Sequence, residues 1–465
     1  MDPWTPDLST YSGYRYRALA EAIRDAILSE ELKPGAKLLA HREMAWRLGV
    51  TIGTVAKAYK VVADWGLLTA RIGDGTRVKE PEDQGDPSET EGRSERDIDF
   101  GLLLPSPLTD MKLRQKAFKD TLYGLGDTLL REPLSGYAHA FGYESHRRAG
   151  AALVARSGFN SPENEIIVTA GAQEAIHLIL SLLTKPSIPI MTEDVGYLGI
   201  KKACKLRNRQ IAPVAMDEHG IIPESLEKVA VKTRSKLLFL VPNFQNPTGS
   251  IMPLERRKAV VEIAERCGFY ILEDNPFWAF SKKMVPPIVS LAPERTFYVI
   301  SMSKFVSPAL RVGYLRALPK FVPELELAKH ALSMSGSFLQ EEVAKQWIES
   351  GVVYELVDWQ RREIEIRWEI ARSILQDVCP IGETAKPFLW LSLPEPWRSP
   401  DFVAALKSEN VTCVDSSHFV NGRGRELSAV RIALSTPISR NSLQEGLKVI
   451  KRTLGQLPDT DLLFH

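Results

Sequence analysis

Residues 237–249 read Leu-Leu-Phe-Leu-Val-Pro-Asn-Phe-Gln-Asn-Pro-Thr-Gly, an apolar run that ends in a turn rich in Pro and Gly. A short apolar run bounded by turn residues is typical of a buried strand. Further runs of this kind occur at residues 165–169, 188–192, 269–273 and 297–301, and most are followed by helical periodicity. Such strands alternating with helices predict an α/β domain whose parallel sheet is covered on both faces.

Polar residues whose side chains could take part in binding or catalysis follow these strands. Asn246 lies in the turn after one run, Asp274 ends the next run 28 residues later, and Lys304 follows another 30 residues further on. Ligands of such sheets bind beyond the carboxyl ends of the strands. The turn over residues 169–173 joins a strand to a helix, so its backbone N–H groups suit a phosphate. A phosphate cradle, an amine, a carboxylate and an amide are the set that pyridoxal phosphate (PLP) chemistry requires.

Charge divides the chain into parts. The 59 Lys and Arg nearly balance the 58 Asp and Glu overall, but residues 1–79 carry a net +3 and residues 80–99 a net −7. The acidic stretch has almost no apolar side chains, so it cannot offset the entropy of ordering and is predicted to be a flexible linker. We expect a module over residues 1–79, a linker over residues 80–98 and a body over residues 99–465, with a small subdomain at roughly residues 330–456.

Composition excludes several classes of protein. Apolar residues make up 44% of the chain, which excludes disorder over most of its length. No apolar run approaches the length of a membrane helix, and the first residues do not form a signal peptide. The four cysteines lie far apart, so neither a disulfide framework nor a metal site is predicted. We expect a cytoplasmic protein with no membrane partner, and we assign no role to His139 or His146.

The first 79 residues show the pattern of a helix-turn-helix. Apolar spacing predicts an amphipathic helix over residues 16–29 and a shorter helix over residues 42–48. Gly49 would end the second helix in a left-handed conformation, and Thr51 would cap a third helix. Two β-like runs then flank Ile72-Gly-Asp-Gly75, which predicts a hairpin or wing.

This module resembles a GntR-type winged helix over nearly all of residues 14–79. The resemblance rests on the stretches Leu32-Lys-Pro-Gly-Ala-Lys-Leu38, His41-Arg-Glu-Met-Ala45, Thr54-Val-Ala-Lys-Ala-Tyr59, Gly66-Leu-Leu68 and Arg71-Ile-Gly-Asp-Gly-Thr76. It implies that double-stranded DNA is the partner, read by the third helix in the major groove and by the wing. The implied DNA contacts are Arg42, Thr51, Thr54, Arg71, Gly73 and Thr76, to which we add Lys57 from its place on the third helix.

Ile52 departs from the family pattern, which often has an Arg beside the capping threonine. A bidentate Arg–guanine pair contributes about 1–3 kcal/mol of discrimination between bases. The operator sequence therefore cannot be carried over from relatives. The alternative interpretation of the module is a solvated helical hairpin that binds no nucleic acid.

The body resembles the fold-type I aminotransferases of the aspartate aminotransferase class over roughly residues 100–456. The resemblance rests on Asn246-Pro-Thr-Gly249 and on Ser301-x-Ser-Lys-x-x-x-Pro-x-x-Arg311-x-Gly313. It implies that Lys304 forms the Schiff base with PLP, that Asp274 pairs with the pyridinium nitrogen, and that Asn246 donates to the ring's 3-oxygen. The residues implied to hold the phosphate and the ring are Gly171, Ala172, Gln173, Ser301, Ser303, Arg311 and Tyr197.

Two more residues are implied by position. Tyr137 would reach the phosphate of a neighbouring subunit, and Arg431 would bind the carboxylate of a substrate or effector. Phe277 departs from the pattern, because many members have a Tyr there that donates to the 3-oxygen, and Ala172 replaces a common Ser or Thr near the phosphate. A lost hydrogen bond costs about 0.5–1.5 kcal/mol. We therefore expect PLP to bind while transaminase activity is weak or absent.

A winged helix joined to an aminotransferase-like body is the architecture of the MocR subfamily of GntR regulators. The resemblance implies a homodimer, head-to-tail in arrangement, that senses an amine or amino acid by external aldimine formation at Lys304. Two alternatives stay open: a catalytically active PLP-dependent aminotransferase with an accessory N-terminal module, and a regulator for which PLP itself is the signal.

Overall fold

The structure is a computed structural model, and it describes residues 4–8, 11, 13–29, 31–33, 35–64, 67–71, 75–78, 97–107, 111–131, 139–280, 285–422 and 427–457. The chain divides into two compact units, Met1–Glu91 and Gly92–His465. Among the described residues, no helix combines the length and the apolar character that crossing a membrane requires.

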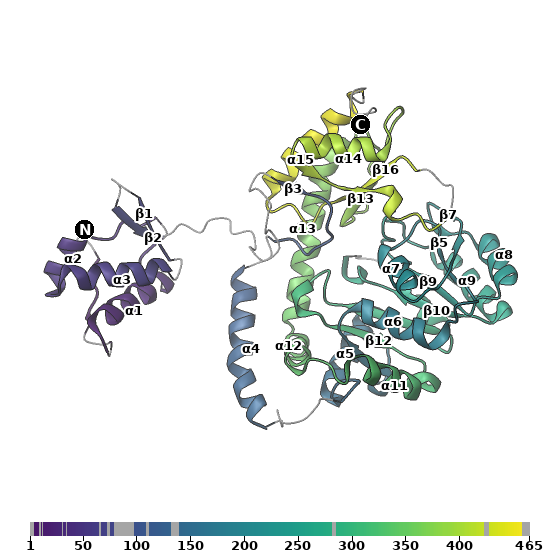
Figure 1. The fold of residues 1–465 in the computed structure, drawn as a ribbon, viewed down its shortest axis with the longest axis horizontal. Helices are drawn as coiled ribbons and strands as arrows, with labels where there is room; N and C mark the ends of the chain where they lie inside the picture. The colour runs from purple at the N-terminus through teal and green to yellow at the C-terminus, as the bar shows by residue number, and fades with distance from the viewer. Residues whose placement is uncertain are drawn as a thin grey trace. The chain divides into compact units, whose positions relative to one another are not determined.

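The first unit packs three helices against a two-stranded hairpin (Figure 1). The elements are α1 (Arg15–Leu28), α2 (His41–Leu48), α3 (Ile52–Asp64), β1 (Leu68–Arg71) and β2 (Gly75–Val78). The strands pair antiparallel, with Leu68 opposite Val78. Both of these side chains are buried together with apolar residues of all three helices, so one core holds the unit together. The predicted helices and hairpin are confirmed, and residues 72–74 at the tip of the hairpin lie outside the described residues.

The turn between α2 and α3 forms as its residues predict. Gly49 has φ 60° and ends α2 in the left-handed region, where a side chain would be strained. Thr51 precedes α3, and its Oγ1 accepts a hydrogen bond from the Thr54 N–H at 3.2 Å. This bond satisfies one of the N–H groups that a helix start leaves without a partner. Both sequence predictions are confirmed.

The second unit is built around a large sheet, seven-stranded within the described residues, with strand order β4-β12-β11-β10-β9-β5-β6. The strands are β4 (Ile166–Thr169), β5 (Ile190–Glu193), β6 (Ile211–Val214), β9 (Leu237–Leu240), β10 (Tyr270–Asp274), β11 (Thr296–Ser301) and β12 (Gly313–Arg316). All run parallel except β12, which pairs antiparallel with both β11 and β4. The predicted parallel sheet thus contains one antiparallel strand, because β12 returns directly after β11 without a crossover helix.

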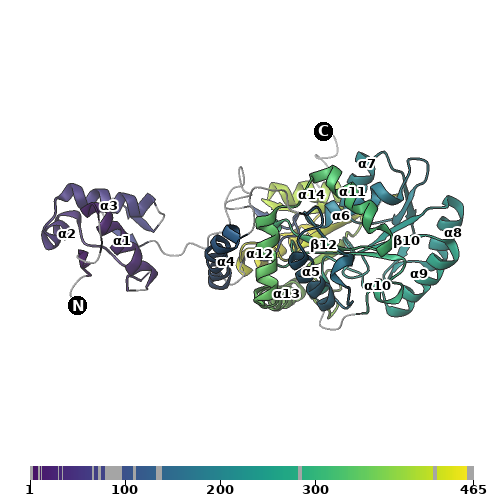
Figure 2. The same ribbon diagram turned by 90° about the horizontal axis from the view of Figure 1, so that it is seen from below.

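Helices cover both faces of this sheet (Figures 1 and 2). Alternate side chains along each strand point to opposite faces, as the pleat requires. Phe239 and Leu272 pack with α6 (Ala172–Leu183) and α7 (Leu198–Leu206) on one face. Leu238 and Ile271 pack with α8 (Pro223–Thr233) and α9 (Leu254–Cys267) on the other. Further helices around the sheet are α5 (Glu144–Arg156), α10 (Ile288–Leu291), α11 (Val322–Ser333) and α12 (Phe338–Glu349).

A smaller layer follows the long helix α13 (Val352–Leu375). It consists of a sheet in the order β13-β16-β15, packed against α14 and α15. Its elements are β13 (Phe388–Ser392), α14 (Ser399–Ser408), β14 (Val411–Thr412), β15 (Val414–Asp415), β16 (Ala429–Ala433) and α15 (Arg440–Leu454). We call this layer with α13 the small subdomain. The short strand β3 (Ile98–Asp99) joins it by pairing with β14, as Figure 1 shows among the yellow-green elements.

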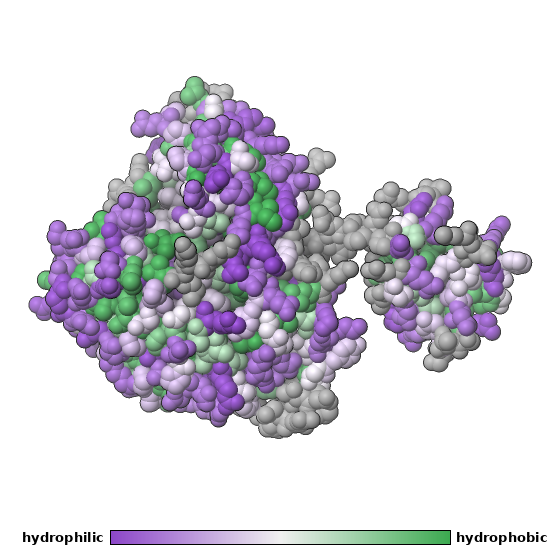
Figure 3. Space-filling model, turned by 180° about the vertical axis from the view of Figure 1, so that it is seen from behind, coloured by the Kyte–Doolittle hydropathy of each residue, from purple (hydrophilic) through white to green (hydrophobic). Residues whose placement is uncertain are grey.

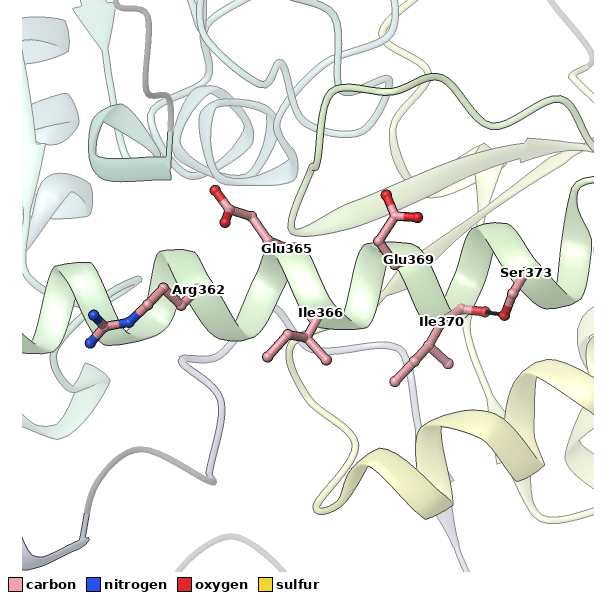
Figure 4. A pocket seen from close by; sticks show the side chains of 6 residues that line it. All are labelled: Arg362, Glu365, Ile366, Glu369, Ile370 and Ser373. Carbon is pink, nitrogen blue, oxygen red and sulfur yellow. Dashed lines mark hydrogen bonds between the residues drawn. The ribbon is translucent and has the colours of Figure 1, made fainter.

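The face of the molecule drawn in Figure 3 carries hydrophilic residues with hydrophobic patches between them. A shallow hollow runs along α13 and is lined by Arg362, Glu365, Ile366, Glu369, Ile370 and Ser373 (Figure 4). In that view the two glutamates project from one side of the helix and the two isoleucines from the other. The helix α4 (Met111–Arg131) also exposes apolar side chains, among them Phe118 and Leu122.

Candidate cofactor site

The large sheet brings the predicted site residues to one edge. Strands β4, β9, β10 and β11 point the same way, so their carboxyl ends meet. Asp274 is the last residue of β10 and Ser301 the last of β11, while Asn246 lies in the loop after β9. Ser303 and Lys304 follow in the turn after Ser301. Residues that are far apart in sequence are therefore gathered because parallel strands end together.

Lys304 is half-buried at this edge, and none of the described carboxylates is its hydrogen-bond partner. Its Nζ donates to the backbone carbonyl oxygen of Leu103 at 2.7 Å. Loss of hydration, together with the charges of Arg431 and Arg311 and against the opposing charge of Asp274, lowers the pKa of this amine to about 8. A substantial fraction of the amine is therefore neutral near physiological pH, and a neutral amine can act as a nucleophile.

Asp274 is buried with one oxygen unsatisfied. Only 3% of the residue is exposed, and Oδ1 has no hydrogen-bond partner among the described residues. Burial raises the pKa of this carboxyl to about 7, the nearby Lys304 lowers it, and Glu273 raises it. A buried carboxylate that lacks a partner is costly unless a cation or a hydrogen-bond donor satisfies it. A positively charged or N–H-bearing group of a ligand would satisfy Asp274 Oδ1.

Arg431 reaches the same place from β16 of the small subdomain. Its Nη1 donates to Asn246 Oδ1 at 2.9 Å and its Nη2 to the carbonyl oxygen of Gly101, while the guanidinium lies 5.0 Å from the centre of the Phe419 ring. Burial lowers the pKa of Arg431 to about 10. Because Asn246 accepts from Arg431 through its oxygen, the amide NH₂ is the group with which Asn246 could donate to a ligand.

The start of α6 forms a concave backbone turn beside Arg311. Gly171 has φ 85° and precedes Ala172, the first residue of α6, so the first N–H groups of the helix, including that of Gln173, have no partners within the helix. Arg311, at φ 50°, donates through Nη2 to the carbonyl oxygen of Ala170 at 2.9 Å. A Cβ added at Gly171 would lie 3.2 Å from Arg311 Nη2. The turn thus combines helix N–H groups with a cation, which suits a phosphate.

Tyr197 is the residue that precedes α7, and it lies near the charges of Asp274, Arg311 and Arg431. Its hydroxyl donates to Gln173 Oε1 at 3.4 Å. Burial and the charge of Asp274, against the opposing charges of Arg311 and Arg431, raise the pKa of Tyr197 to about 12. The ring therefore lies within electrostatic reach of all three charged residues, although they come from three different elements.

These residues fit PLP. An unsatisfied buried carboxylate suits a protonated ring nitrogen, an amine of low pKa suits the aldehyde, and the α6 turn with Arg311 suits the phosphate. Phe277 is buried against Phe280 and Phe388, with ring centroids 6.2 and 5.5 Å away, so an apolar ring lies where a hydroxyl is common. Tyr137 lies outside the described residues.

Sequence reasoning missed two features of the site. The carbonyl groups of Gly101 and Leu103 come from a segment distant in sequence, and backbone acceptors leave no residue signature. Glu193 is fully buried, and its pKa is raised to about 8. Burial and the charge of Asp274 raise this pKa, and hydrogen bonds from Gln245 and the Val241 N–H oppose them. Its position at the end of β5 was a usable signal, because the other strand ends carry site residues.

The predicted DNA contacts lie on the first unit. Arg42, Thr51 and Lys57 are exposed, and Thr54 and Thr76 are half-buried. The Lys57 Nζ lies 4.0 Å from the centre of the Tyr16 ring. Arg71 ends β1 with only its backbone described, and Gly73 lies outside the described residues. The exposed start of α3, with Ile52 half exposed, is a face that could enter a groove.

Comparison with known protein families identifies the families that the two units resemble. Residues 111–450 match the family model "Aminotransferase class I and II", which covers most of the chain. The chain belongs to the class I and II aminotransferase family. Residues 15–78 match the model "Bacterial regulatory proteins, gntR family". A GntR-type helix-turn-helix module is therefore fused to an aminotransferase domain of the PLP-dependent class, the combination found in the MocR subfamily of GntR regulators.

Individual proteins are similar over nearly the whole chain. The "Uncharacterized HTH-type transcriptional regulator YdeF" of Bacillus subtilis (strain 168) is 27% identical over 98% of this chain and 97% of its own length. The "HTH-type transcriptional regulator TauR" of Rhodobacter capsulatus is 25% identical over 94% of this chain and 96% of its own. Pyrococcus horikoshii kynurenine aminotransferase matches with a TM-score of 0.71 over 78% of this chain and 91% of its own, at 23% identity. This likeness confirms the fold-type I aminotransferase fold of the second unit.

Proposed function

We propose that this protein is a PLP-dependent, DNA-binding transcriptional regulator that responds to an amine or amino acid at Lys304. The observation that carries the proposal is that a GntR-type module shares one chain with a site whose buried charges fit PLP. Relatives that align along nearly the whole chain carry the name of HTH-type transcriptional regulators, which supports the same function. The protein would act where DNA lies, in the cytoplasm.

PLP supplies an aldehyde that condenses with primary amines and a ring that withdraws electrons. Lys304 holds the amine that an incoming effector would replace, and its low pKa allows it to give up and take up a proton near neutral pH. Asp274 would keep a proton on the ring nitrogen through a charge-assisted bond of about 1.5–3 kcal/mol. Asn246 would donate to the ring's 3-oxygen through its amide NH₂, and Tyr197 would stack on the ring.

The remaining site residues would bind and orient. Ser301, Ser303, Arg311 and the Gly171-Ala172-Gln173 turn would hold the phosphate, and Arg431 would hold the effector's carboxylate. Arg431 now donates to a neutral carbonyl and an amide, and a carboxylate is the stronger acceptor for a guanidinium. A ligand that favours one placement of the small subdomain would shift the population toward it.

The assembly we propose is a head-to-tail homodimer in which Tyr137 reaches the phosphate of the neighbouring subunit. Two winged helices per dimer would raise the affinity for an operator, because each module carries only a modest positive charge. Binding should therefore weaken steeply as salt is added.

The test measures DNA binding of the cofactor-loaded protein by footprinting upstream of its own gene, with and without each common amino acid. At least one amino acid should change both the footprint and the absorption of the cofactor. Lys304→Ala should abolish the change in the footprint, because no lysine remains for the effector to displace. A response of Lys304→Ala equal to that of the wild type would refute the proposal, and Lys258→Ala, at an exposed lysine on α9, is the control.

A second candidate is a working aminotransferase, favoured by the presence of Lys304, Asp274, Asn246 and Arg431 together at the site. Multiple turnovers of an amino acid with a keto acid would support it. A single turnover that then stops would favour the regulator, since Phe277 removes one donor to the ring. Footprinting of the cofactor-free protein with added PLP alone distinguishes a regulator that senses the cofactor from one that senses an amine, because only the former should respond to PLP by itself.

A further inference from the structure

Arg257 of α9 is fully buried, and its guanidinium bonds the loop that carries Asn246. Nε donates to the Met252 carbonyl oxygen at 2.9 Å, and Nη2 donates to Asn243 Oδ1 at 2.6 Å. Asn243 and Met252 lie on either side of Asn246 in the sequence. One rigid, planar group therefore holds both ends of this loop.

A chain of side-chain hydrogen bonds continues from Asn243. Its Nδ2 donates to Asn275 Oδ1 at 3.2 Å, and Asn275 Nδ2 donates to the Tyr298 hydroxyl at 2.8 Å. That hydroxyl donates to Ser157 Oγ at 2.9 Å, and Ser157 Oγ donates to the Val154 carbonyl oxygen at 2.7 Å. Asn275, Tyr298 and Ser157 are each at most 2% exposed, so these bonds lie in the interior. We call this set of residues the polar chain: Arg257, Asn243, Asn275, Tyr298 and Ser157.

The two ends of the polar chain fix its direction. A guanidinium can only donate hydrogen bonds, and a carbonyl oxygen can only accept them. Asn243 must therefore turn its oxygen to Arg257 and its NH₂ to Asn275, and Asn275 must turn its NH₂ to Tyr298. A reversed amide would bring buried donors face to face, which is unfavourable. Bonds that all point one way polarise one another, so the polar chain acts as a unit.

The polar chain joins the two loops that carry the ring contacts of the proposed cofactor site. Asn275 follows Asp274 directly, and Asn243 precedes Asn246 by three residues. Asp274 would bond the ring nitrogen of PLP, and Asn246 would bond the 3-oxygen. Both atoms belong to one rigid aromatic ring, so their two partners have to keep a fixed separation. The bond between Asn243 and Asn275 links one of these loops to the other.

The charge of Glu273 gives Arg257 a second possible role, as a counter-charge. Glu273 accepts hydrogen bonds from the N–H groups of Ile288 at 3.1 Å and Val289 at 2.9 Å, at the start of α10. The charge of Arg257 lowers the pKa of Glu273, but burial outweighs it and raises that pKa to about 7. A variant that keeps the charge at position 257 and loses the planar fork separates the two roles.

We propose that the polar chain positions Asp274 and Asn246 for the PLP ring. Its members are positioning residues, because they act on the cofactor through these two side chains. When a link is broken, the ring nitrogen and the 3-oxygen are no longer bonded with good geometry at the same time, and PLP binds less tightly. This inference rests on the proposed function, since it takes PLP to be the ligand of the site.

The first test titrates the full-length, cofactor-free protein with PLP and follows the absorption. Arg257→Lys keeps the positive charge but cannot bond Met252 and Asn243 with one planar fork, so PLP should bind about tenfold more weakly. Arg256→Lys is the matched control on the same helix, because Arg256 bonds Asp217 of β7 (Met216–Asp217) instead. The control should bind PLP as tightly as the wild type.

The second test uses a spectroscopic signature of the ring. Tyr298→Phe removes one hydroxyl from the polar chain, and nitrogen NMR of PLP labelled at the ring nitrogen reports whether that nitrogen carries its proton. A displaced Asp274 stabilises the protonated ring less well, so the ring nitrogen should lose its proton at a pH lower by about half a unit. Tyr314→Phe, at a buried tyrosine of the adjacent strand β12, is the matched control and should leave this pH unchanged.

Combining the two changes tests whether the polar chain acts as a unit. The double variant Arg257→Lys/Tyr298→Phe should bind PLP within about threefold of Arg257→Lys alone, because either change breaks the same chain. Losses that multiply would show two independent sites and contradict the unit. If Arg257→Lys does not fold, the milder Tyr298→Phe still decides the question through its PLP affinity and its NMR signature.

Denaturant unfolding of each cofactor-free variant separates positioning from a purely structural role. The inference is overturned if Arg257→Lys and Tyr298→Phe unfold more easily but bind PLP with wild-type affinity and keep the wild-type pH of the ring nitrogen. The proposed function fails on different results: a wild-type protein that takes up no PLP, or one that takes it up and shows no change of footprint with any amino acid.

Discussion

Two clusters of buried charge lie in the aminotransferase domain, and they differ in how they are neutralised. In the first, His146 on α5 bonds Glu341 Oε2 through Nδ1 at 3.0 Å and Glu342 Oε2 through Nε2 at 2.9 Å, and Lys345 also pairs with Glu342. In the second, Lys304 and Arg431 bond backbone carbonyls, and Asp274 Oδ1 has no hydrogen-bond partner in the part of the chain that the structure describes. The first cluster is closed upon itself, and the second is open to a ligand.

The carboxyl groups show the same difference. Although burial raises the pKa of Glu342, its hydrogen bonds to His146, Lys345 and Gln346 bring it to about 2. Burial and the charge of Glu273, opposed by the charge of Lys304, raise the pKa of Asp274 to about 7. Buried charges that are fully paired stabilise one arrangement of the helices, whereas buried charges left unpaired mark a binding site.

The largest effect is expected from breaking the closed cluster. His146→Gln would remove the cation that bonds buried Glu341 and would leave Glu342 with Lys345 as its cation, which should lower the free energy of unfolding by about 3–5 kcal/mol. Denaturant unfolding of the cofactor-free protein measures this loss. His139→Gln, at a half-exposed histidine 3.3 Å from Glu326, is the control and should cost less than about 1 kcal/mol. Equal losses of unfolding free energy for the two variants would contradict the conclusion that the buried, paired cluster around His146 stabilises the fold.

The same cluster predicts a pH dependence. Burial lowers the pKa of His146, but its bonds to Glu341 and Glu342 outweigh burial, so the pKa lies above the ordinary 6.5. The stabilisation from His146 is therefore complete below 6.5 and is lost as pH rises through the raised value. The difference in unfolding free energy between wild type and His146→Gln should narrow as the solution becomes alkaline. A difference that widens there would contradict this sign.

A smaller effect is expected at the open cluster. Asp274→Asn removes the charge that would pair with the ring nitrogen, which should weaken PLP binding by about 1.5–3 kcal/mol, or roughly ten- to a hundredfold. Titration of the cofactor-free protein with PLP, followed by absorption, measures the loss. The unfolding free energy of the cofactor-free variant should not fall, because the substitution removes a buried charge whose Oδ1 has no hydrogen-bond partner among the described residues. Unchanged PLP affinity would mean that Asp274 does not face the ring.

The smallest effect is expected from Phe277→Tyr. The new hydroxyl would supply a donor toward the ring's 3-oxygen, worth about 0.5–1.5 kcal/mol, so the turnover of amino acids should rise by roughly two- to tenfold. Steady-state transamination measures this change. Phe280→Tyr, in the same apolar cluster, is the matched control and should bring no such gain. A fall in turnover would place the new hydroxyl among apolar side chains instead.

Much of the fold followed from local patterns. The apolar runs at residues 237–241 and 297–301 became β9 and β11, and Gly49 and Thr51 formed the turn that their residue types predict. β6 and β12 were not predicted. β12 carries polar and glycine residues, and its antiparallel direction depends on the strands between which it inserts.

The sequence by itself determined which chemical groups are present and in what order along the chain: an amine, a carboxylate, an amide and a phosphate turn, each at a strand end. Each of them follows a strand, and the carboxyl ends of parallel strands meet at one edge of a sheet, so the order of the motifs was sufficient to associate them. Tertiary structure alone decided that the carbonyl groups of Leu103 and Gly101 accept from Lys304 and Arg431. It also decided that His146 pairs with a glutamate of α12, and that β3 joins the small subdomain. These contacts join residues hundreds of positions apart through backbone atoms or packing, and neither leaves a pattern in a single sequence.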